Sequence, residues 1–246
     1  MPGGAHEPAE RGRREGDAGG LAVHSTLALA GVVGALRGPF EAASGLVLTV
    51  AFAPTALLME RIAAGERPDL ALLTAEAAAE LDARGLLRGA PRPLVRSSLG
   101  IAAAPGGSAP EIGSLPALVR FLRAAPSIAY SRSGASGRFF AALLDRLALR
   151  AVVDAKAVIV PSGFTAERVV SGEAAYAVQQ VSELLFVPGI GPVAPLPEEA
   201  QSRAVFAAAL LPGPRAREAE ALVAHLTHPD RAGVLAAWGL RPEPAG

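Results

Sequence analysis

The chain has 246 residues, of which 51% are hydrophobic and 19% charged, and its 23 basic and 23 acidic side chains leave a formal net charge of zero. This composition is typical of a globular protein and excludes a largely disordered chain. The neutral balance gives no reason to expect nucleic acid as a partner, because binding to nucleic acid depends on an excess of basic side chains. The chain has no cysteine, which excludes disulfides, thiol catalysis and thiolate metal sites.

Residues 1–20 are polar, charged and rich in glycine, which predicts a disordered leader. They contain no apolar run and therefore no secretory signal peptide. The apolar run 27–36 follows a predicted strand and continues toward a glycine stop at Gly45, which favours a core helix over a signal sequence. No stretch reaches the ~20 apolar residues that a transmembrane helix needs.

Strands and helices alternate along the chain from Leu21 onward. The predicted strands of the first part are residues 21–24, 46–52 and 69–74. Each strand is followed by a helical pattern that ends at a glycine, namely Gly45, Gly65 and Gly85. Thr55 is expected to cap the second of these helices. This order predicts a parallel sheet that is covered by helices on both faces.

A second set of strands and helices follows the first. Its predicted strands are residues 97–105, 127–130, 157–160, 176–180, 193–196 and 204–212. Two sets of elements predict two lobes, and strands 97–105 and 204–212 are expected to cross between them. We assign residues 21–100 together with 205–246 to the first lobe and residues 101–204 to the second.

Small hydroxyl and amide residues follow the predicted strands. In open α/β sheets, ligands bind beyond the carboxyl ends of the strands, where helix N-termini attract anions. The predicted ligand-binding residues at these ends are Ser25, Thr26, Pro54, Thr55, Ser133, Gly134, Ala135, Ser136, Gln179 and Gln180. Arg132 and Arg138 flank the serine-glycine loop and could pair with an anionic ligand. The plainer interpretation is that each serine or threonine only caps a helix.

The same loop does not favour an enzyme. Arg138 stands where the nucleophile elbow of serine hydrolases needs a glycine. The histidine nearest the predicted site, His24, is interpreted as a strand-end residue. The sequence therefore offers no general base for a serine nucleophile. No grouping of His, Asp and Glu has metal-ligand spacing, and no phosphate-binding glycine pattern occurs. We therefore predict no catalytic residue, no metal and no cofactor.

Several segments, in the order in which they occur, resemble the extracellular solute-binding proteins of ABC importers, in the molybdate-binding-like branch with the type II periplasmic-binding fold. They are "VHSTLAL", "FAPTALLMERIAAGERPDLALLTAEAAAELDARGLL", "IAYSRSGASGRFFAALLDRL", "GEAAYAVQQVSELL" and "LTHPDRAGVLAAWGL". The resemblance covers about Leu21 to Leu240. It implies two α/β lobes, each a mostly parallel sheet flanked by helices, with two crossing strands as the hinge about which the lobes close on a ligand.

The resemblance also implies a function. In molybdate-binding members, serine hydroxyls and backbone N–H groups hold the oxyanion, and the matching positions here are Ser25, Thr55 and the loop of residues 133–136. Gln179 and Gln180 stand where those members often present a tyrosine, so that a small organic carboxylate is the alternative ligand. The expected protein is a monomer that delivers its anion to an ABC-type permease.

The resemblance places such a protein outside the cytoplasm, whereas a chain that starts with this leader and has no signal peptide would stay in the cytoplasm. The alternative function is therefore a cytosolic ligand-sensing module of the same fold. A serine-dependent enzyme that uses Ser133 or Ser136 is a further alternative.

Overall fold

The computed structural model describes residues 20–132 and 134–243. The predicted leader, apart from Gly20, and the predicted ligand-binding residue Ser133 lie outside the described residues. No helix of the described part is both long enough and apolar enough to cross a membrane.

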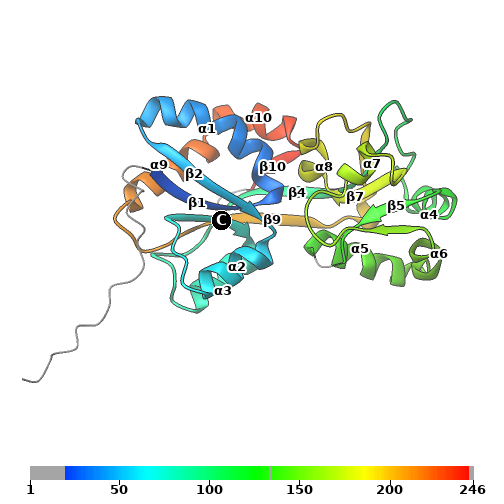
Figure 1. The fold of residues 1–246 in the computed structure, drawn as a ribbon, viewed down its shortest axis with the longest axis horizontal. Helices are drawn as coiled ribbons and strands as arrows, with labels where there is room; N and C mark the ends of the chain where they lie inside the picture. The colour runs from blue at the N-terminus through cyan, green and yellow to red at the C-terminus, as the bar shows by residue number, and fades with distance from the viewer. Residues whose placement is uncertain (1–19, 133, 244–246) are drawn as a thin grey trace, which may run out of the picture.

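The described chain alternates strands and helices, as the sequence predicts (Figure 1). The strands are β1 (Gly20–Thr26), β2 (Val47–Ala53), β3 (Leu70–Thr74), β4 (Arg92–Ala103), β5 (Ile128–Tyr130), β6 (Ala157–Ile159), β7 (Tyr176–Gln180), β8 (Val193–Pro195), β9 (Arg203–Leu210) and β10 (Leu240–Pro242). The α-helices are α1 (Ala30–Ser44), α2 (Thr55–Ala63), α3 (Ala75–Ala83), α4 (Leu115–Ala124), α5 (Ala135–Arg146), α6 (Arg150–Asp154), α7 (Glu167–Val170), α8 (Val181–Phe186), α9 (Ala216–Thr227) and α10 (Ala232–Ala237). Short 3₁₀ turns are η1 (Leu27–Leu29), η2 (Glu198–Ala200) and η3 (Pro229–Arg231).

The strands form one continuous path with the order β2-β1-β3-β9-β4-β7-β5-β6, and β8 and β10 pair with β4 beside it. In the first lobe, β1 is parallel to both β2 and β3, and in the second lobe β5 is parallel to both β6 and β7. Strand β9 is antiparallel to β3 and to β4, and β4 is antiparallel to β7. The carboxyl ends of the parallel strands therefore share one edge within each lobe.

Strand β4 belongs to both lobes. Its residues 92–98 pair with β9, and residues 99–103 pair with β7. Figure 1 shows β4 and β9 running side by side from one half of the molecule to the other. The predicted two-lobed α/β fold with crossing strands is thereby confirmed, whereas the exact lobe boundaries remain a prediction.

The central strand β3 of the first-lobe sheet is buried on both faces, which explains why its sequence is apolar almost throughout. Leu70 and Leu72 pack into the core beneath α1 and α9, whereas Ala71 and Leu73 pack into the core beneath α2 and α3. Successive side chains of a strand point to opposite faces, so a strand with helices on both sides needs a continuous apolar run. The second lobe has two cores of its own. Tyr130 and Phe140 belong to one of them, and Ala129 and Val160 belong to the other.

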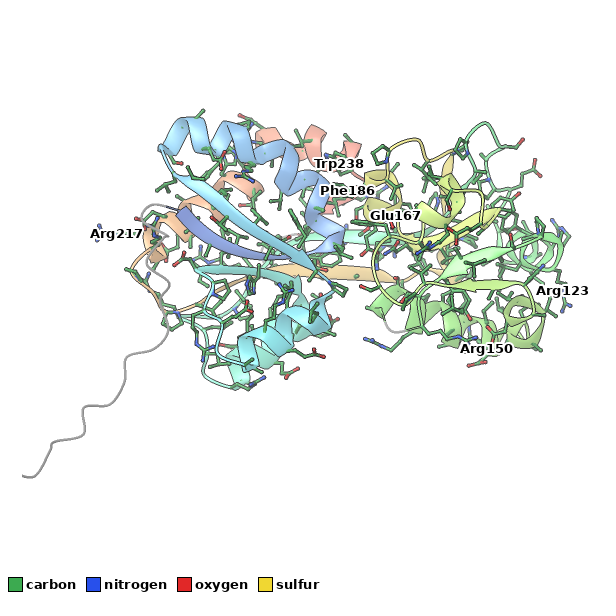
Figure 2. The ribbon with its side chains drawn as sticks, in the orientation of Figure 1. Arg123, Arg150, Glu167, Phe186, Arg217 and Trp238 are labelled. Atoms are coloured by element: carbon green, nitrogen blue, oxygen red, sulfur yellow. The ribbon has the colours of Figure 1, made fainter. Side chains whose placement is uncertain are left out.

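The two lobes also touch on the side of α8. The rings of Phe186 in α8 and Trp238, just after α10, have centroids 6.2 Å apart (Figure 2). Trp238 in turn packs against Gly31 of α1, where a Cβ would lie 2.4 Å from the indole ring. This contact joins the C-terminal part of the first lobe to the second lobe.

The sequence-based boundaries differ from the structure at several helix starts. Pro54 is the N-cap of α2 and Thr55 is its first residue, so the prediction that Thr55 caps this helix is wrong. Helices α6 and α8 are not predicted, because each is shorter than two helical turns and gives no periodic pattern, and the three-residue strand β10 is not predicted either.

Candidate functional site

A cavity of about 510 Å³ lies between the two lobes, at the carboxyl ends of the parallel strands. First-lobe residues that follow β1, β2 and β3 line one side, and second-lobe residues that follow β5, β6 and β7 line the other. The polar and charged side chains that line it are Thr26, Thr55, Thr74, Glu76, Glu80, Ser131, Ser136, Arg138, Ser162, Gln179, Gln180 and Glu183. Polar groups from distant parts of the chain thus surround one space.

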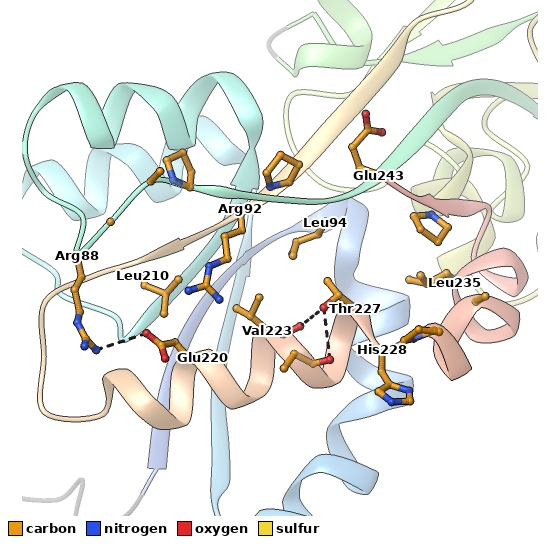
Figure 3. Close-up of a pocket in the computed structure, with 18 residues that line it drawn as sticks. Arg88, Arg92, Leu94, Leu210, Glu220, Val223, Thr227, His228, Leu235 and Glu243 are labelled. Carbon is orange, nitrogen blue, oxygen red and sulfur yellow. Dashed lines mark hydrogen bonds and ion pairs between the residues drawn. The ribbon is translucent and has the colours of Figure 1, made fainter. Parts of the chain in front are cut away.

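A larger cavity, of about 1070 Å³, lies within the first lobe between the start of β4 and helices α9 and α10 (Figure 3). It is lined by apolar side chains such as Leu94, Val223 and Leu235, and the Arg88 guanidinium lies 3.8 Å from the Glu220 carboxylate at its edge. None of the predicted ligand-binding residues lines it. Size alone therefore does not identify the site, and the polar composition favours the smaller cavity.

Two threonines contribute hydroxyl groups to the first-lobe wall. Thr55 Oγ1 donates a hydrogen bond to Thr26 Oγ1 over 3.2 Å, although the residues are on different helix starts. Thr26 is the N-cap of η1, but its side chain makes no capping hydrogen bond. Thr55 is not a cap at all, because the N-cap of α2 is Pro54. The plainer interpretation, that these threonines serve only as caps, therefore does not describe them. The hydroxyl proton of Thr26 is not used in the bond with Thr55 and can point to a ligand.

Ser25 differs from its neighbour. It is fully buried, its Oγ donates to the backbone carbonyl of Thr26 over 3.2 Å, and it is not among the residues that line the cavity. Successive side chains of a strand point to opposite sides, so Ser25 and Thr26 cannot both reach one space.

The serine-glycine loop forms the second-lobe wall at the start of α5. Gly134, Ala135 and Ser136 all line the cavity, as does Ser131, which is not among the predicted residues. The backbone N–H of Gly134 donates to Ser131 Oγ over 3.2 Å, which folds the loop back on the strand end. The first N–H groups of a helix have no partner within the helix, so the start of α5 directs such N–H groups and the positive end of the helix dipole toward the cavity.

Gly137 explains why this loop needs glycine. A Cβ at this position would lie 1.5 Å from the backbone oxygen of Ser131. Only glycine allows α5 to begin so close to the end of β5. The loop is therefore held in a tight turn that places the helix start at the cavity wall.

The two predicted arginines have different surroundings. Arg138 lines the cavity from the first turn of α5, and its backbone N–H donates to Gly134 O over 2.9 Å. Arg132 does not line the cavity; its guanidinium lies 3.5 Å from the Asp154 carboxylate, which also accepts a hydrogen bond from the Tyr130 hydroxyl. Only Arg138 is thus placed toward a ligand in the cavity.

The glutamines at the end of β7 are both buried and both line the cavity. The Gln179 side chain is fixed by its own partners: Oε1 accepts from the backbone N–H and hydroxyl of Thr165 at 2.8 and 3.0 Å, and Nε2 donates to Gly163 O at 3.1 Å. The Gln180 side chain takes part in a capping box at the start of α8, in which it faces the backbone N–H of Glu183, but its buried Oε1 makes no hydrogen bond of good geometry with a described donor. A buried acceptor without a donor favours a ligand or water that donates at this wall.

Glu183, in the first turn of α8, is a cavity residue that the sequence analysis missed. It is 8% exposed, lines the cavity, and its Oε2 accepts from the backbone N–H of Gln180 over 3.3 Å. Burial raises the pKa of this carboxyl to about 7, although hydrogen bonds from Gln180 and Gln179 partly oppose the shift. An acidic residue at the third helical position after a polar N-cap residue is a capping pattern, and that is the sequence signal that marks it.

The arrangement suits an anion that is bound mainly by neutral groups. Hydroxyls from both lobes and the N-terminus of α5 supply hydrogen-bond donors, and Arg138 supplies positive charge. Among the described residues, no group of three His, Asp or Glu side chains could hold a metal ion.

Comparison with known proteins identifies the relatives of this chain. It is 32% identical over 233 residues to an aconitate isomerase from Pseudomonas sp, covering 92% of this chain and 88% of that protein. Its fold is similar to that of the periplasmic molybdate-binding protein of Azotobacter vinelandii, with a TM-score of 0.77, 17% identity, and coverage of 91% of this chain and 100% of that chain. The tungstate-binding protein of Desulfovibrio alaskensis G20 is similar with a TM-score of 0.61, 16% identity, and coverage of 93% and 100%.

The family model of bacterial extracellular solute-binding proteins matches residues 21–241, nearly the whole described chain. The predicted resemblance is thus confirmed at the level of family and fold. The chain belongs to the bacterial extracellular solute-binding proteins and has the two-lobed fold of their molybdate-binding-like members.

Proposed function

We propose that the protein captures a small anion in the cavity between its lobes. The observation that carries this proposal is the convergence of polar groups from both lobes on one cavity: Thr26 and Thr55 from the first, and Ser131, Ser136 and Arg138 from the second. A bound anion would accept hydrogen bonds from both walls at once. Such a ligand would favour the closed arrangement of the lobes, because only that arrangement offers all the donors together.

Within this function, a small organic carboxylate is a better candidate than molybdate. The cavity volume of about 510 Å³ is in the range of sites for organic ligands and exceeds what a tetrahedral oxyanion fills. The planar guanidinium of Arg138 can bind a carboxylate with two parallel hydrogen bonds. The relative with 32% identity is named for aconitate, a tricarboxylate, whereas the molybdate and tungstate binders are similar in fold at 16–17% identity.

A ligand screen tests the proposal. The protein is heated with trans-aconitate, tricarballylate, succinate, molybdate and sulfate, and unfolding is followed. A true ligand stabilises the folded state by RT ln(1 + [L]/Kd), or about 2.7 kcal/mol at a hundredfold excess over Kd. Stabilisation by a carboxylate and not by sulfate or molybdate is the expected result. No stabilisation by any of the five would contradict the proposal.

We further propose that the captured solute is passed to an ABC-type permease outside the cytoplasm, in keeping with the family to which the chain belongs. Cells that lack the protein should then take up the bound solute more slowly, and expression of the intact chain should restore uptake. Uptake that does not change in the deletion strain would argue against a transport role.

A second candidate function is the isomerisation of an unsaturated carboxylate, because the relative with 32% identity is named aconitate isomerase. Removal of a proton from the CH₂ carbon of aconitate and its return to the former alkene carbon would move the double bond, with no co-reactant. Glu183, a cavity carboxyl with a pKa of about 7, is the kind of group that exchanges a proton near neutral pH.

Proton NMR in D₂O distinguishes this candidate from capture alone. An isomerase should convert cis-aconitate to the trans isomer, incorporate deuterium, and lose this activity in Glu183→Gln. Capture alone predicts that aconitate binds and is recovered unchanged.

A further inference from the structure

We propose that Glu183 is a specificity-determining residue of the cavity, which binds the anionic ligand as a neutral carboxylic acid and donates its own proton to a ligand oxygen. Capture of the ligand would then take up a proton from solution. This inference rests on the proposed function of the cavity. It goes beyond that function, because hydroxyls and helix N-termini can bind an anion without a protonated Glu183.

The first step of the argument is the position of the carboxyl group. Glu183 lines the cavity and is almost completely buried, so a ligand in the cavity and this carboxyl are not separated by bulk water. Its hydrogen bonds come from neutral groups, the backbone N–H of Gln180 to Oε2 and the side chain of Gln179. None of the ion pairs among the described residues includes Glu183.

The second step is the charge around the cavity. The other charged residues that line it are Arg138 from α5 and Glu76 and Glu80 from α3. Neither glutamate can neutralise Glu183, and Arg138 is not a cause of the shift in its pKa. An ionised Glu183 would therefore confront a ligand anion across the cavity with no cation paired to it, and the two negative charges would repel each other.

The elements packed against α8 do not supply such a cation. They are α1, η1, β4, β7 and β8. Neither η1 nor β8 carries a titratable side chain, and the charged or titratable residues of the other three are Arg37, Glu41, Arg92, Arg96 and Tyr176. Arg37 pairs with Glu41, Arg96 pairs with Glu243, and Arg92 lines the larger, separate cavity. None of these residues is a cause of the shifted pKa of Glu183.

The third step compares the two protonation states. The pKa of Glu183 is about 7 without a ligand, so the neutral form is already abundant at neutral pH. An anion next to the carboxyl would raise this pKa further. Protonation therefore costs little, removes the repulsion, and adds a hydrogen-bond donor at a wall where Gln180 Oε1 and Glu183 would otherwise offer acceptors.

The test is the pH dependence of binding, measured by titration calorimetry with tricarballylate and with molybdate. Neither probe has a double bond to isomerise, and both are ionised from about pH 7 upward. If the neutral form of Glu183 binds, the apparent Kd should rise roughly 50-fold between about pH 7 and about pH 9. Titrations in buffers of different ionisation enthalpy should show uptake of nearly one proton at about pH 8.

Two variants assign this effect to one residue. Glu183→Gln keeps a neutral hydrogen-bond donor and suits the same helical position, so it should bind within a few-fold of the wild-type affinity at pH 7, independently of pH and without proton uptake. The matched control is Glu80→Gln, which removes an acid from the opposite wall of the same cavity and should keep the wild-type pH dependence.

The outcomes separate the inference from the function on which it rests. Binding whose affinity and proton count do not change with pH, or a Glu183→Gln variant that retains the pH dependence, overturns the inference and leaves capture intact. If neither probe binds at any pH and none of the other anions of the screen stabilises the fold, the proposed capture of a small anion is itself wrong, and the inference falls with it.

Discussion

Replacing Gly137 by alanine should damage both stability and ligand binding. The new Cβ would lie 1.5 Å from the backbone oxygen of Ser131 and 2.5 Å from its carbonyl carbon, whereas carbon atoms in contact are about 3.5–4.0 Å from their neighbours. The start of α5 and the end of β5 must therefore separate by roughly 2 Å. Overpacking of this kind costs about 1–3 kcal/mol, and the clash with backbone favours the upper part of that range.

Thermal unfolding measures the effect on stability. For a domain of this size, each kcal/mol changes Tm by about 2–4 °C, so Gly137→Ala should lower Tm by roughly 6–12 °C. Because the displaced loop carries Ser131, Ser136 and Arg138, calorimetry should also show weaker anion binding.

The matched control is Gly34→Ala. Gly34 lies within α1, is exposed, and has no atom within 4 Å of the position of a Cβ. Alanine is the better helix former there by about 0.5–1 kcal/mol, so this variant should be more stable than the wild type. A Gly137→Ala protein that unfolds at or above the wild-type Tm and binds normally would refute the close approach of α5 to β5.

Three further predictions concern the cavity. Thr26→Val should weaken anion binding by about 10–100-fold in calorimetry through loss of the hydroxyl that can donate to the ligand, whereas Thr49→Val, on the exposed part of β2, should not; equal affinities would remove Thr26 from the site. Arg138→Ala should weaken binding at least about tenfold. Arg132 does not line the cavity, so Arg132→Ala should weaken binding by less than about threefold. A larger loss in Arg132→Ala than in Arg138→Ala would contradict the placement of the two arginines. The pKa of Glu183 is raised from 4.5 to about 7, so the stability that its protonated form contributes is fully present below about pH 4.5 and is lost as the pH rises to about 7. Denaturant unfolding should show that the wild type loses about 3 kcal/mol of unfolding free energy relative to Glu183→Gln over that range. Unfolding free energies of the two proteins that change equally with pH would contradict the buried acid.

The fold could be predicted from the sequence because its strands and helices have strong and different periodicities. Strand β3 reads as a continuous apolar run, which is what a strand covered on both faces requires, and the helices that follow end at glycines such as Gly45 and Gly85, with φ of 71° and 66°. The short helix α8 gave no such signal, since six residues are too few to show a helical period.

The candidate site could be predicted only in part. The ends of the strands were identifiable, but the direction of each side chain was not. Ser25 and Thr26 are both polar residues at the end of β1, and the sequence does not reveal which of the two points to the cavity; in the structure it is Thr26.

Glu183 was missed for a different reason. A glutamate in a first helical turn is usually exposed, and its burial here results from the packing of α8 against β4 and α1, which are distant in sequence. The same packing raises its pKa, so the chemical character of this residue is a property of the tertiary structure.

The central claim is that a small anion binds between the lobes, to groups from both. Titration calorimetry of the wild type and of Arg138→Ala with tricarballylate, trans-aconitate and molybdate tests it most directly. The account predicts saturable binding at one site for at least one of these anions, and a loss of at least about tenfold in affinity in the variant. Binding of equal strength in both proteins would place the ligand elsewhere, such as in the larger cavity of the first lobe, and would contradict the claim.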